Sequence, residues 1–287
     1  MYYVALQALG DNLVSIYLLN QLDKKINVIG TKHTENIVQL VELEDNFDVK
    51  VIFDDIPAFY DIRNQGILKT IKDIFKFRKY IKKQNIKELI FEKKDFRIML
   101  LTFGLNVKNH SSNKYSNVYY NRKNLIREAY SKLVDIDDTI SYEDNIHTIL
   151  ISPVTRLKKK NIVSEHLNVI VKFLKNNGFK IQLVDYSKEY NEFANKVDEY
   201  FVDTTLEDMK NLMNSCSLYI GADSFLVHLA YYCKKPYFII FNQANETFLP
   251  PISKQVDNYI VIDESIDLLL QLERKFIDLG LFRSGPK

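Results

Sequence analysis

The chain has 287 residues, enough for two ordinary domains of roughly 100 to 200 residues each. Apolar residues make up 46% of it and aromatic residues 13%, which supplies packed cores and excludes a disordered chain. The net charge of +2 is the small difference between 39 basic and 37 acidic side chains, which excludes a surface built throughout for nucleic acid.

The N-terminal segment MYYVALQALGD has neither the basic region nor the cleavage site of a signal peptide. No apolar run approaches the roughly 20 residues of a membrane span. The two cysteines, Cys216 and Cys233, lie in or near apolar segments without metal-ligand spacing, which favours a reducing compartment. We therefore expect a cytoplasmic protein.

Short apolar strands alternate with longer segments of helical period, the pattern of an α/β fold whose parallel sheets are covered by helices. In the first half we predict strands at residues 2–6, 26–29, 49–53, 88–91 and near 107, and helices at 12–22, 66–84 and 96–103. Residues 111–124 are polar and turn-rich, and the pattern breaks off between residues 130 and 145. This stretch divides the chain into predicted domains 1–140 and 141–287.

After the boundary the pattern restarts. We predict strands at residues 147–152, 180–184, 217–220 and 237–241, and helices at 164–177, 206–214, 225–233 and 265–279. The terminal helix is a candidate to pack back on the first domain.

Ligands of open parallel sheets bind beyond the carboxyl ends of the strands, so the polar loops that follow strands are candidate sites. The loop ALGDNL places Gly10 and Asp11 between the first strand and the first helix. Asp11 has two compatible interpretations, as the N-cap of the helix and as a general base facing a cleft between the domains.

The loop SPVTRLKKKN, residues 152–161, carries a run of basic side chains. Such a run is usually a solvated face. A lysine and a threonine hydroxyl beside a helix start are also what a nucleoside diphosphate needs for charge neutralisation and orientation.

The third candidate loop, in GADSFLVHLA, precedes the predicted helix at residues 225–233. Asp223 or Ser224 can cap that helix, and His228 follows one turn further on. The residues alone leave open whether His228 is structural or binds a ligand.

These loops have the order and spacing seen in the heptosyltransferase family of bacterial glycosyltransferases, which the chain resembles. The similar segments are ALGDNLVSIYLLNQL, TRLKKKN and TTLEDMKNLMNSCSLYIGADSFLVHLAYYCKKPYFIIF. The resemblance implies GT-B architecture, with two Rossmann-like domains facing across a cleft. It also implies transfer of a sugar, with inversion, from a nucleoside diphosphate donor, with no metal and no cofactor besides that co-substrate.

Carried over by position, the resemblance makes Asp11 the base that deprotonates the acceptor hydroxyl, with the first domain holding the acceptor. It makes Thr155 and Lys159 contacts of the donor diphosphate, with Arg156 as a further candidate.

The same resemblance makes Asp223, Ser224 and His228 donor contacts in the second domain. Glu189, after the strand KIQLV, sits where the family places a carboxylate near the ribose. The implied function is the transfer of a heptose or other hexose-like sugar to a cell-surface polysaccharide or lipid-linked glycan, in bacterial lipopolysaccharide or capsule biosynthesis.

The chain departs from the family pattern at Phe225 and Leu226, which replace a Gly-Pro pair. The replacement removes the conformational freedom by which the glycine would bring backbone close to phosphate. This departure keeps two alternatives open. One is a GT-B-shaped binding or scaffold protein without catalysis, and the other is a nucleotide-sugar epimerase on the same fold.

Residues 69–97 carry eleven Lys and Arg against four Asp and Glu. The helical part has apolar residues at roughly helical spacing: Ile67, Leu68, Ile71, Ile74, Phe75 and Ile81. One interpretation is a core-packed helix with a solvated basic face. The other is attraction to an anionic membrane or saccharide, with peripheral attachment at the inner face of the cell membrane. No nucleic-acid module is present.

Overall fold

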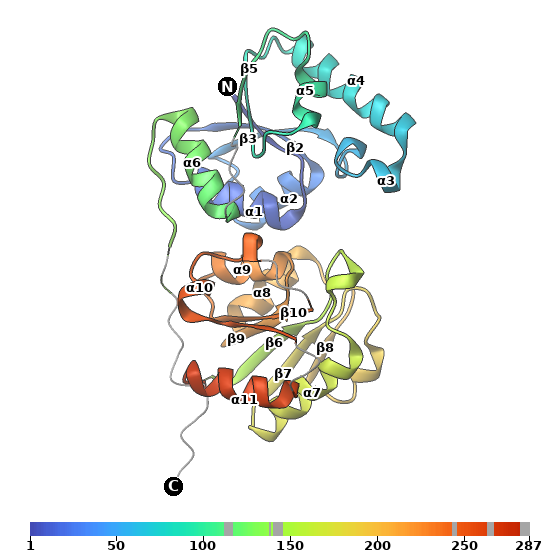
Figure 1. Ribbon diagram of the computed structural model, residues 1–287, viewed down its shortest axis with the longest axis vertical. Coiled ribbons are helices and arrows are strands. Elements are labelled where there is room, and N and C mark those ends of the chain that lie inside the picture. Colours follow the sequence, from blue (N-terminus) through green and yellow to red (C-terminus); the bar gives the residue numbers. More distant parts are fainter. Residues whose placement is uncertain (112–116, 138, 140–145, 243–245, 263–266, 282–287) are drawn as a thin grey trace. The chain divides into compact units, whose positions relative to one another are not determined.

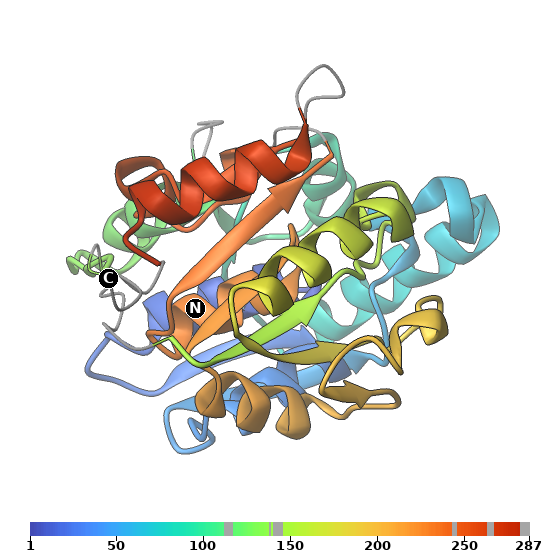
Figure 2. The same cartoon turned by 90° about the horizontal axis from the view of Figure 1, so that it is seen from below.

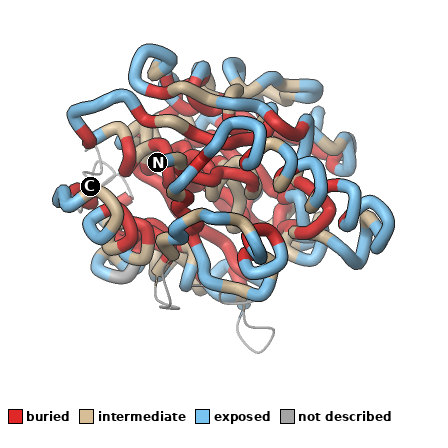
Figure 3. The backbone as a smooth tube through the Cα atoms, turned by 90° about the horizontal axis from the view of Figure 1, so that it is seen from above, coloured by how far each residue is buried: buried red, intermediate tan, exposed pale blue. Residues whose placement is uncertain are grey.

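The computed structural model describes residues 1–111, 117–137, 139, 146–242, 246–262 and 267–281. The chain divides into two compact units, Met1–Ile136 (unit 1) and Asp137–Lys287 (unit 2). The sequence predicted the division four residues later, between residues 140 and 141. Each unit has its own parallel sheet. Figure 3 colours the backbone by burial, with the buried residues in red and the exposed ones in pale blue.

Unit 1 has a five-stranded sheet in the order β3-β2-β1-β4-β5. Its strands are β1 (Tyr2–Ala5), β2 (Ile26–Thr31), β3 (Phe47–Phe53), β4 (Glu88–Phe91) and β5 (Lys108–Ser111). Its α-helices are α1 (Leu9–Leu19), α2 (Lys32–Leu40), α3 (Ile62–Gln65), α4 (Ile67–Lys83), α5 (Phe96–Thr102) and α6 (Val118–Tyr130).

The helices of unit 1 lie on both faces of this sheet (Figure 1). On one face α1 packs between α2 and α6, and on the other α4 packs against α5. The second face has a core in which Phe77 of α4 and Leu101 of α5 meet the strands. Helices therefore cover both faces of the sheet, and loops lie at the ends of its strands.

The segment 111–124, predicted to be turn-rich, is in part the helix α6, which corrects that prediction. Val118, Leu125 and Ile126 are buried at helical spacing, and Asn117 caps the helix by accepting a hydrogen bond from Tyr119 N at 2.9 Å. The many polar side chains of α6 hid this apolar stripe in the sequence.

Unit 2 has a six-stranded sheet in the order β11-β10-β9-β6-β7-β8. Its strands are β6 (Thr148–Ser152), β7 (Lys180–Val184), β8 (Glu199–Phe201), β9 (Leu218–Ala222), β10 (Tyr237–Phe241) and β11 (Tyr259–Val261). Its α-helices are α7 (Ser164–Asn176), α8 (Leu206–Ser215), α9 (Phe225–Tyr232), α10 (Ser253–Val256) and α11 (Leu268–Asp278).

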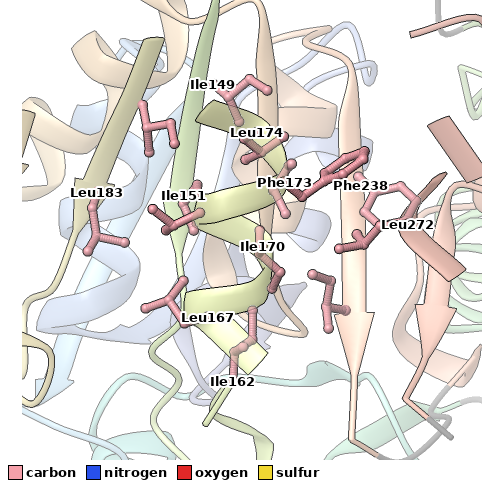
Figure 4. Packing of buried hydrophobic residues seen from close by; sticks show 14 of the residues in the cluster. Ile149, Ile151, Ile162, Leu167, Ile170, Phe173, Leu174, Leu183, Phe238 and Leu272 are labelled. Carbon is pink, nitrogen blue, oxygen red and sulfur yellow. The ribbon is translucent and has the colours of Figure 1, made fainter. Parts of the chain in front are cut away.

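Helices α7 and α11 lie side by side on one face of this sheet, and α8 and α9 lie on the other (Figures 1 and 2). Phe276 of α11 meets the ring of Phe173 edge-on, with 5.0 Å between centroids. Figure 4 shows Phe173, Phe238 and Leu272 packed together in this core.

The position of α11 corrects the suggestion that the terminal helix packs back on the first domain, because Leu272 and Phe276 are fully buried in the core of unit 2. Among the described residues, no helix is both long and apolar enough to cross a membrane.

Candidate active site

In unit 1 the predicted base lies where the strand order reverses. Connections run from β1 toward β3 on one side and from β4 to β5 on the other, so β1 and β4 flank the switch point, where open parallel sheets bind ligands. Asp11 lies in the first turn of α1, after β1, and Glu92 directly follows β4.

The N-cap interpretation of Asp11 is wrong. Helix α1 begins at Leu9, and its N-cap is Ala8, which forms no side-chain cap. Asp11 is the third residue of the helix, and its carboxylate has a partner outside α1.

That partner is Arg122 of α6, whose Nη2 donates to Asp11 Oδ1 at 3.1 Å. The same nitrogen also donates to Glu92 Oε2. The Arg122 side chain is 1% exposed and that of Glu92 2%, whereas that of Asp11 is 19% exposed. Asp11 is thus the member of this cluster that meets solvent.

Glu92 is held from the other side by hydroxyl groups. Ser15 Oγ lies 2.5 Å from Glu92 Oε1, and Tyr3 Oη lies 3.3 Å from the same oxygen. The cluster joins β1, α1, β4 and α6, so the position of Asp11 depends on residues far apart in the chain.

Charge keeps Arg122 protonated in this buried place. Burial lowers the pKa of Arg122, but the carboxylates of Glu92 and Asp11 outweigh it, and the net pKa lies above its ordinary value. Two of its nitrogens, Nε and Nη1, are buried without a hydrogen-bond partner in the part of the chain that the structure describes. Arg122 therefore serves the two carboxylates through Nη2.

In unit 2 the predicted donor residues follow neighbouring strands. The sheet order places β10, β9, β6 and β7 side by side, with the switch point between β6 and β9. Contacts between the loops after these strands join them into one cluster.

The contact between the loops after β6 and β9 is an ion pair. Lys160 Nζ lies 2.6 Å from Asp223 Oδ2, with side chains 29% and 9% exposed. Lys160 also lies 6.0 Å from the ring centroid of Phe248. Within the described ranges Arg156 and Lys159 are exposed and have no ion-pair partner. The structure thus singles out Lys160, which the sequence motif did not.

Thr155 and Asn161 fix the shape of the loop after β6. Thr155 Oγ1 donates to Leu157 O at 2.7 Å, and Thr155 N donates to Asn161 Oδ1 at 2.8 Å. Asn242, after β10, donates from Nδ2 to Asn161 O at 2.6 Å. The Thr155 hydroxyl therefore closes its own turn in this structure.

Glu189 joins the same cluster from the loop after β7. It pairs with Lys158, and Asn161 Nδ2 donates to its Oε2 at 3.4 Å. The loop is shaped by Asp185, which is fully buried and accepts from Tyr190 N at 2.7 Å. Glu189 thus contacts the loop after β6, which carries predicted donor residues.

The start of α9 supplies the third part of the cluster. Ser224 is the N-cap, accepting from Leu226 N at 3.2 Å. His228 lies one turn further on and is 6% exposed. Leu226, one of the two departures from the family pattern, is 2% exposed, so it packs in the core. Phe225 is half-buried.

Two residues at this edge, Ser152 and Tyr219, are buried, and the Tyr219 hydroxyl lies beside the hydroxyls of Ser152 and Ser224. A Cβ placed on Gly221 would lie 2.0 Å from Tyr219 Oη and 2.9 Å from Ser152 O. Gly221 is therefore needed for packing beneath the site.

Four residues of these clusters are not among the residues predicted from the sequence: Glu92, Arg122, Asp185 and Lys160. Glu92 directly follows a predicted strand, which is a usable signal for an edge position. Arg122 had no such signal in the sequence, because the segment that forms its helix was predicted to be a loop. In the described ranges no group of three His, Cys, Asp or Glu side chains is arranged to hold a metal ion.

A sequence model of glycosyltransferase family 9 (heptosyltransferase) matches residues 104–268, more than half of the chain. The matched range includes α6 and the predicted donor residues of unit 2, and it begins after Asp11. A search of curated proteins finds no match to this chain.

Solved structures share the fold over nearly the whole chain. The E. coli heptosyltransferase WaaC with ADP-2-deoxy-2-fluoro heptose has a TM-score of 0.67 at 14% identity, covering 98% of this chain and 100% of that one. A family 9 glycosyltransferase from Veillonella parvula DSM 2008 has a TM-score of 0.64 at 15% identity, covering 98% and 97%. The chain thus has the GT-B fold, as predicted.

Proposed function

We infer the activity from the family, since the chain belongs to glycosyltransferase family 9, the heptosyltransferases. We propose that it transfers a heptose or other hexose-like sugar, with inversion and without a metal, from a nucleoside diphosphate donor to a glycan acceptor. The acceptor in this proposal is a bacterial cell-surface polysaccharide or lipid-linked glycan, modified on the cytoplasmic side of the membrane.

The observation that carries the proposal is the contact of Lys160 with Asp223 at 2.6 Å. It joins the basic loop after β6 to the start of α9, where backbone N–H groups and the helix dipole favour an anion. A donor diphosphate at this place meets the cations of the loop and the first turn of α9 together. The similar E. coli enzyme holds an ADP-linked heptose analogue, which supports a donor of this class.

Inverting transfer needs a base on one face of the anomeric carbon and stabilisation of the departing diphosphate on the other. Asp11 in unit 1 is proposed as the base, because its carboxylate is part-exposed while Arg122 holds it in place. In unit 2, Lys160, Lys159, Arg156 and the start of α9 are proposed to stabilise the leaving diphosphate. Thr155, Glu189, Asp223, Ser224 and His228 complete the proposed donor site.

The proposal is tested by incubating the protein with a panel of nucleoside diphosphate sugars, with and without acceptor glycans. We expect release of nucleoside diphosphate together with a lengthened glycan, and only when acceptor is present. Interconversion of the donor without acceptor would make the protein an epimerase, and nucleotide binding without turnover would make it a binding protein.

A further inference from the structure

Helix α5 is apolar on the face that it turns to solvent. Phe96, Met99, Leu100 and Phe103, at its end, follow the i, i+3, i+4, i+7 spacing of one helical face. All four are exposed, Phe96 at 65% and Phe103 at 76%. The opposite face, with Ile98 and Leu101, is buried in the core of unit 1.

Helix α4 continues this surface. Ile67, Leu68, Ile71 and Phe75 are exposed, Leu68 at 85% and Phe75 at 66%, so these residues do not pack in the core as the first interpretation of the segment required. The core side of α4 is formed by Phe77 and Ile81 instead.

The two apolar stripes adjoin. Arg78, one turn after Phe75, donates from Nη1 to Leu100 O of α5 at 3.0 Å, and the two helices pack together. We define the α4–α5 surface as the exposed apolar residues of both helices: Ile67, Leu68, Ile71, Phe75, Phe96, Met99, Leu100 and Phe103.

A row of positive charge borders the α4–α5 surface. Lys72, Lys76, Lys79 and Lys83 are exposed and fall at i, i+4, i+7 and i+11, beside the apolar stripe of α4. The only acidic residue of α4, Asp73, is buried and accepts a hydrogen bond from Ala58 N at 2.8 Å. The exposed charge of this helix is therefore entirely positive.

We propose that the α4–α5 surface binds an anionic lipid bilayer, with its apolar side chains in the interface and the lysines on the lipid headgroups. A contiguous exposed apolar patch marks an interaction site, and a lysine row beside it complements anionic lipid. A second copy of the chain fits poorly, because a two-fold interface would bring identical lysine rows together.

The surface also lies near the proposed base. Helix α5 begins at Phe96, capped by Asp95, only four residues after Glu92, which shares Arg122 with Asp11. A lipid-linked acceptor held in the bilayer would thus enter unit 1 from this side. That link to the acceptor rests on the proposed function, whereas the membrane contact does not.

The experiment is co-sedimentation of the full chain with two kinds of vesicle, phosphatidylethanolamine mixed equally with phosphatidylglycerol, and phosphatidylcholine alone. The test variant is Phe75→Glu with Phe103→Glu. Its matched control is Leu270→Glu with Ile277→Glu on α11, where the side chains are also exposed, at 54% and 65%. Both double variants change the net charge equally.

We expect the test variant to lose binding to the anionic vesicles by at least roughly tenfold, while the control binds like the parent. Lys72→Glu with Lys79→Glu should lose binding by about tenfold or more, while Lys172→Glu with Lys175→Glu on α7 should change it far less. Binding to phosphatidylcholine vesicles should be weak for every protein.

Equal binding by test and control variants would overturn the proposal. So would a parent protein that forms a dimer in solution, ignores vesicles, and becomes a monomer in the Phe75→Glu, Phe103→Glu variant, since the surface would then join two copies. Nucleotide binding, measured by calorimetry on the same proteins, reports on the proposed function separately. Its absence in the parent protein would leave the vesicle result standing.

Discussion

Asp11 combines two properties that a general base needs, a fixed position and access to solvent. Its Oδ1 lies 3.1 Å from Arg122 Nη2, and its side chain is 19% exposed. Asp11→Asn keeps the shape but removes the proton acceptor, so we expect turnover to fall by at least roughly a hundredfold. Nucleotide affinity, measured by calorimetry, should stay nearly unchanged. Turnover within a few fold of the parent would leave Asp11 as a structural partner of Arg122.

Arg122 is the counter-charge of two carboxylates, one of them fully buried. Arg122→Met should destabilise the protein by about 3 to 5 kcal/mol, because Glu92 would remain buried without a cation. The measurement is urea-induced unfolding. Arg127→Met is the matched control, since Arg127 is exposed on the same helix, and it should change stability by less than about 0.5 kcal/mol. Similar losses of unfolding free energy in the two variants would mean that the ion pairs of Arg122 contribute little to stability.

The three lysines of the loop after β6 have different surroundings. Lys158 pairs with Glu189, Lys160 with Asp223, and Lys159 is exposed. If Lys160 binds the donor diphosphate, Lys160→Ala should weaken the binding of a nucleoside diphosphate by about 1 to 3 kcal/mol. The binding of the nucleoside should barely change. Lys159→Ala should produce the same pattern to a smaller degree. Equal losses for nucleotide and nucleoside, seen by calorimetry, would place neither lysine on phosphate.

For single residues, the sequence predicts which loops lie together at the sheet edge better than it predicts which side chains contact each other. Asp223, Ser224 and Glu189 follow strands that are recognisable from apolar runs, and the structure brings Asp223 and Glu189 to one basic loop. Neighbouring lysines cannot be told apart by a motif, because a loop of 3-10 form at Lys158–Lys160 turns successive side chains in different directions.

Among the elements, α9 carries the most direct prediction. His228 is buried one turn into this helix, so truncation to alanine would leave a cavity and lower the stability of the unliganded protein as well. His228→Gln keeps most of the volume. If His228 supports donor phosphate, this variant should lose about 1 to 3 kcal/mol of nucleotide affinity.

The control for His228→Gln is Thr205→Ala, which removes the cap of α8 in the same unit and should lower unliganded stability by about 1 kcal/mol. Thermal unfolding and calorimetry on both variants separate the two roles. A His228→Gln protein that loses stability while keeping its nucleotide affinity would show that His228 only packs.

The central strands could be predicted almost to the residue, because strands buried on both faces have largely apolar sequences. The ranges 88–91, 180–184 and 237–241 agree with β4, β7 and β10. The edge strands β8 and β11, three residues each, were missed because they are short and half-buried. Helix α2 was missed because its capping box, formed by Thr31 and Thr34, lacks the usual acidic partner.

For the whole molecule, separate cores predict separate unfolding. Clusters around Phe77 in unit 1 and Phe276 in unit 2 have no member in common. In differential scanning calorimetry we expect two transitions. A nucleoside diphosphate at a hundred times its dissociation constant should stabilise only the unit 2 transition, by about 2.7 kcal/mol. A single transition that moves as one on adding nucleotide would contradict this expectation.

Arg122 also has a consequence for the order of events on the ribosome. Glu92 leaves the ribosome 30 residues ahead of the arginine that neutralises it, a delay on the order of seconds at usual rates of synthesis. During that interval β1 and β4 have been synthesised, but the positive charge that lets Glu92 be buried has not. We therefore expect unit 1 to complete its fold only after α6 has emerged, so that a chain stalled before Arg122 would be a substrate for chaperones.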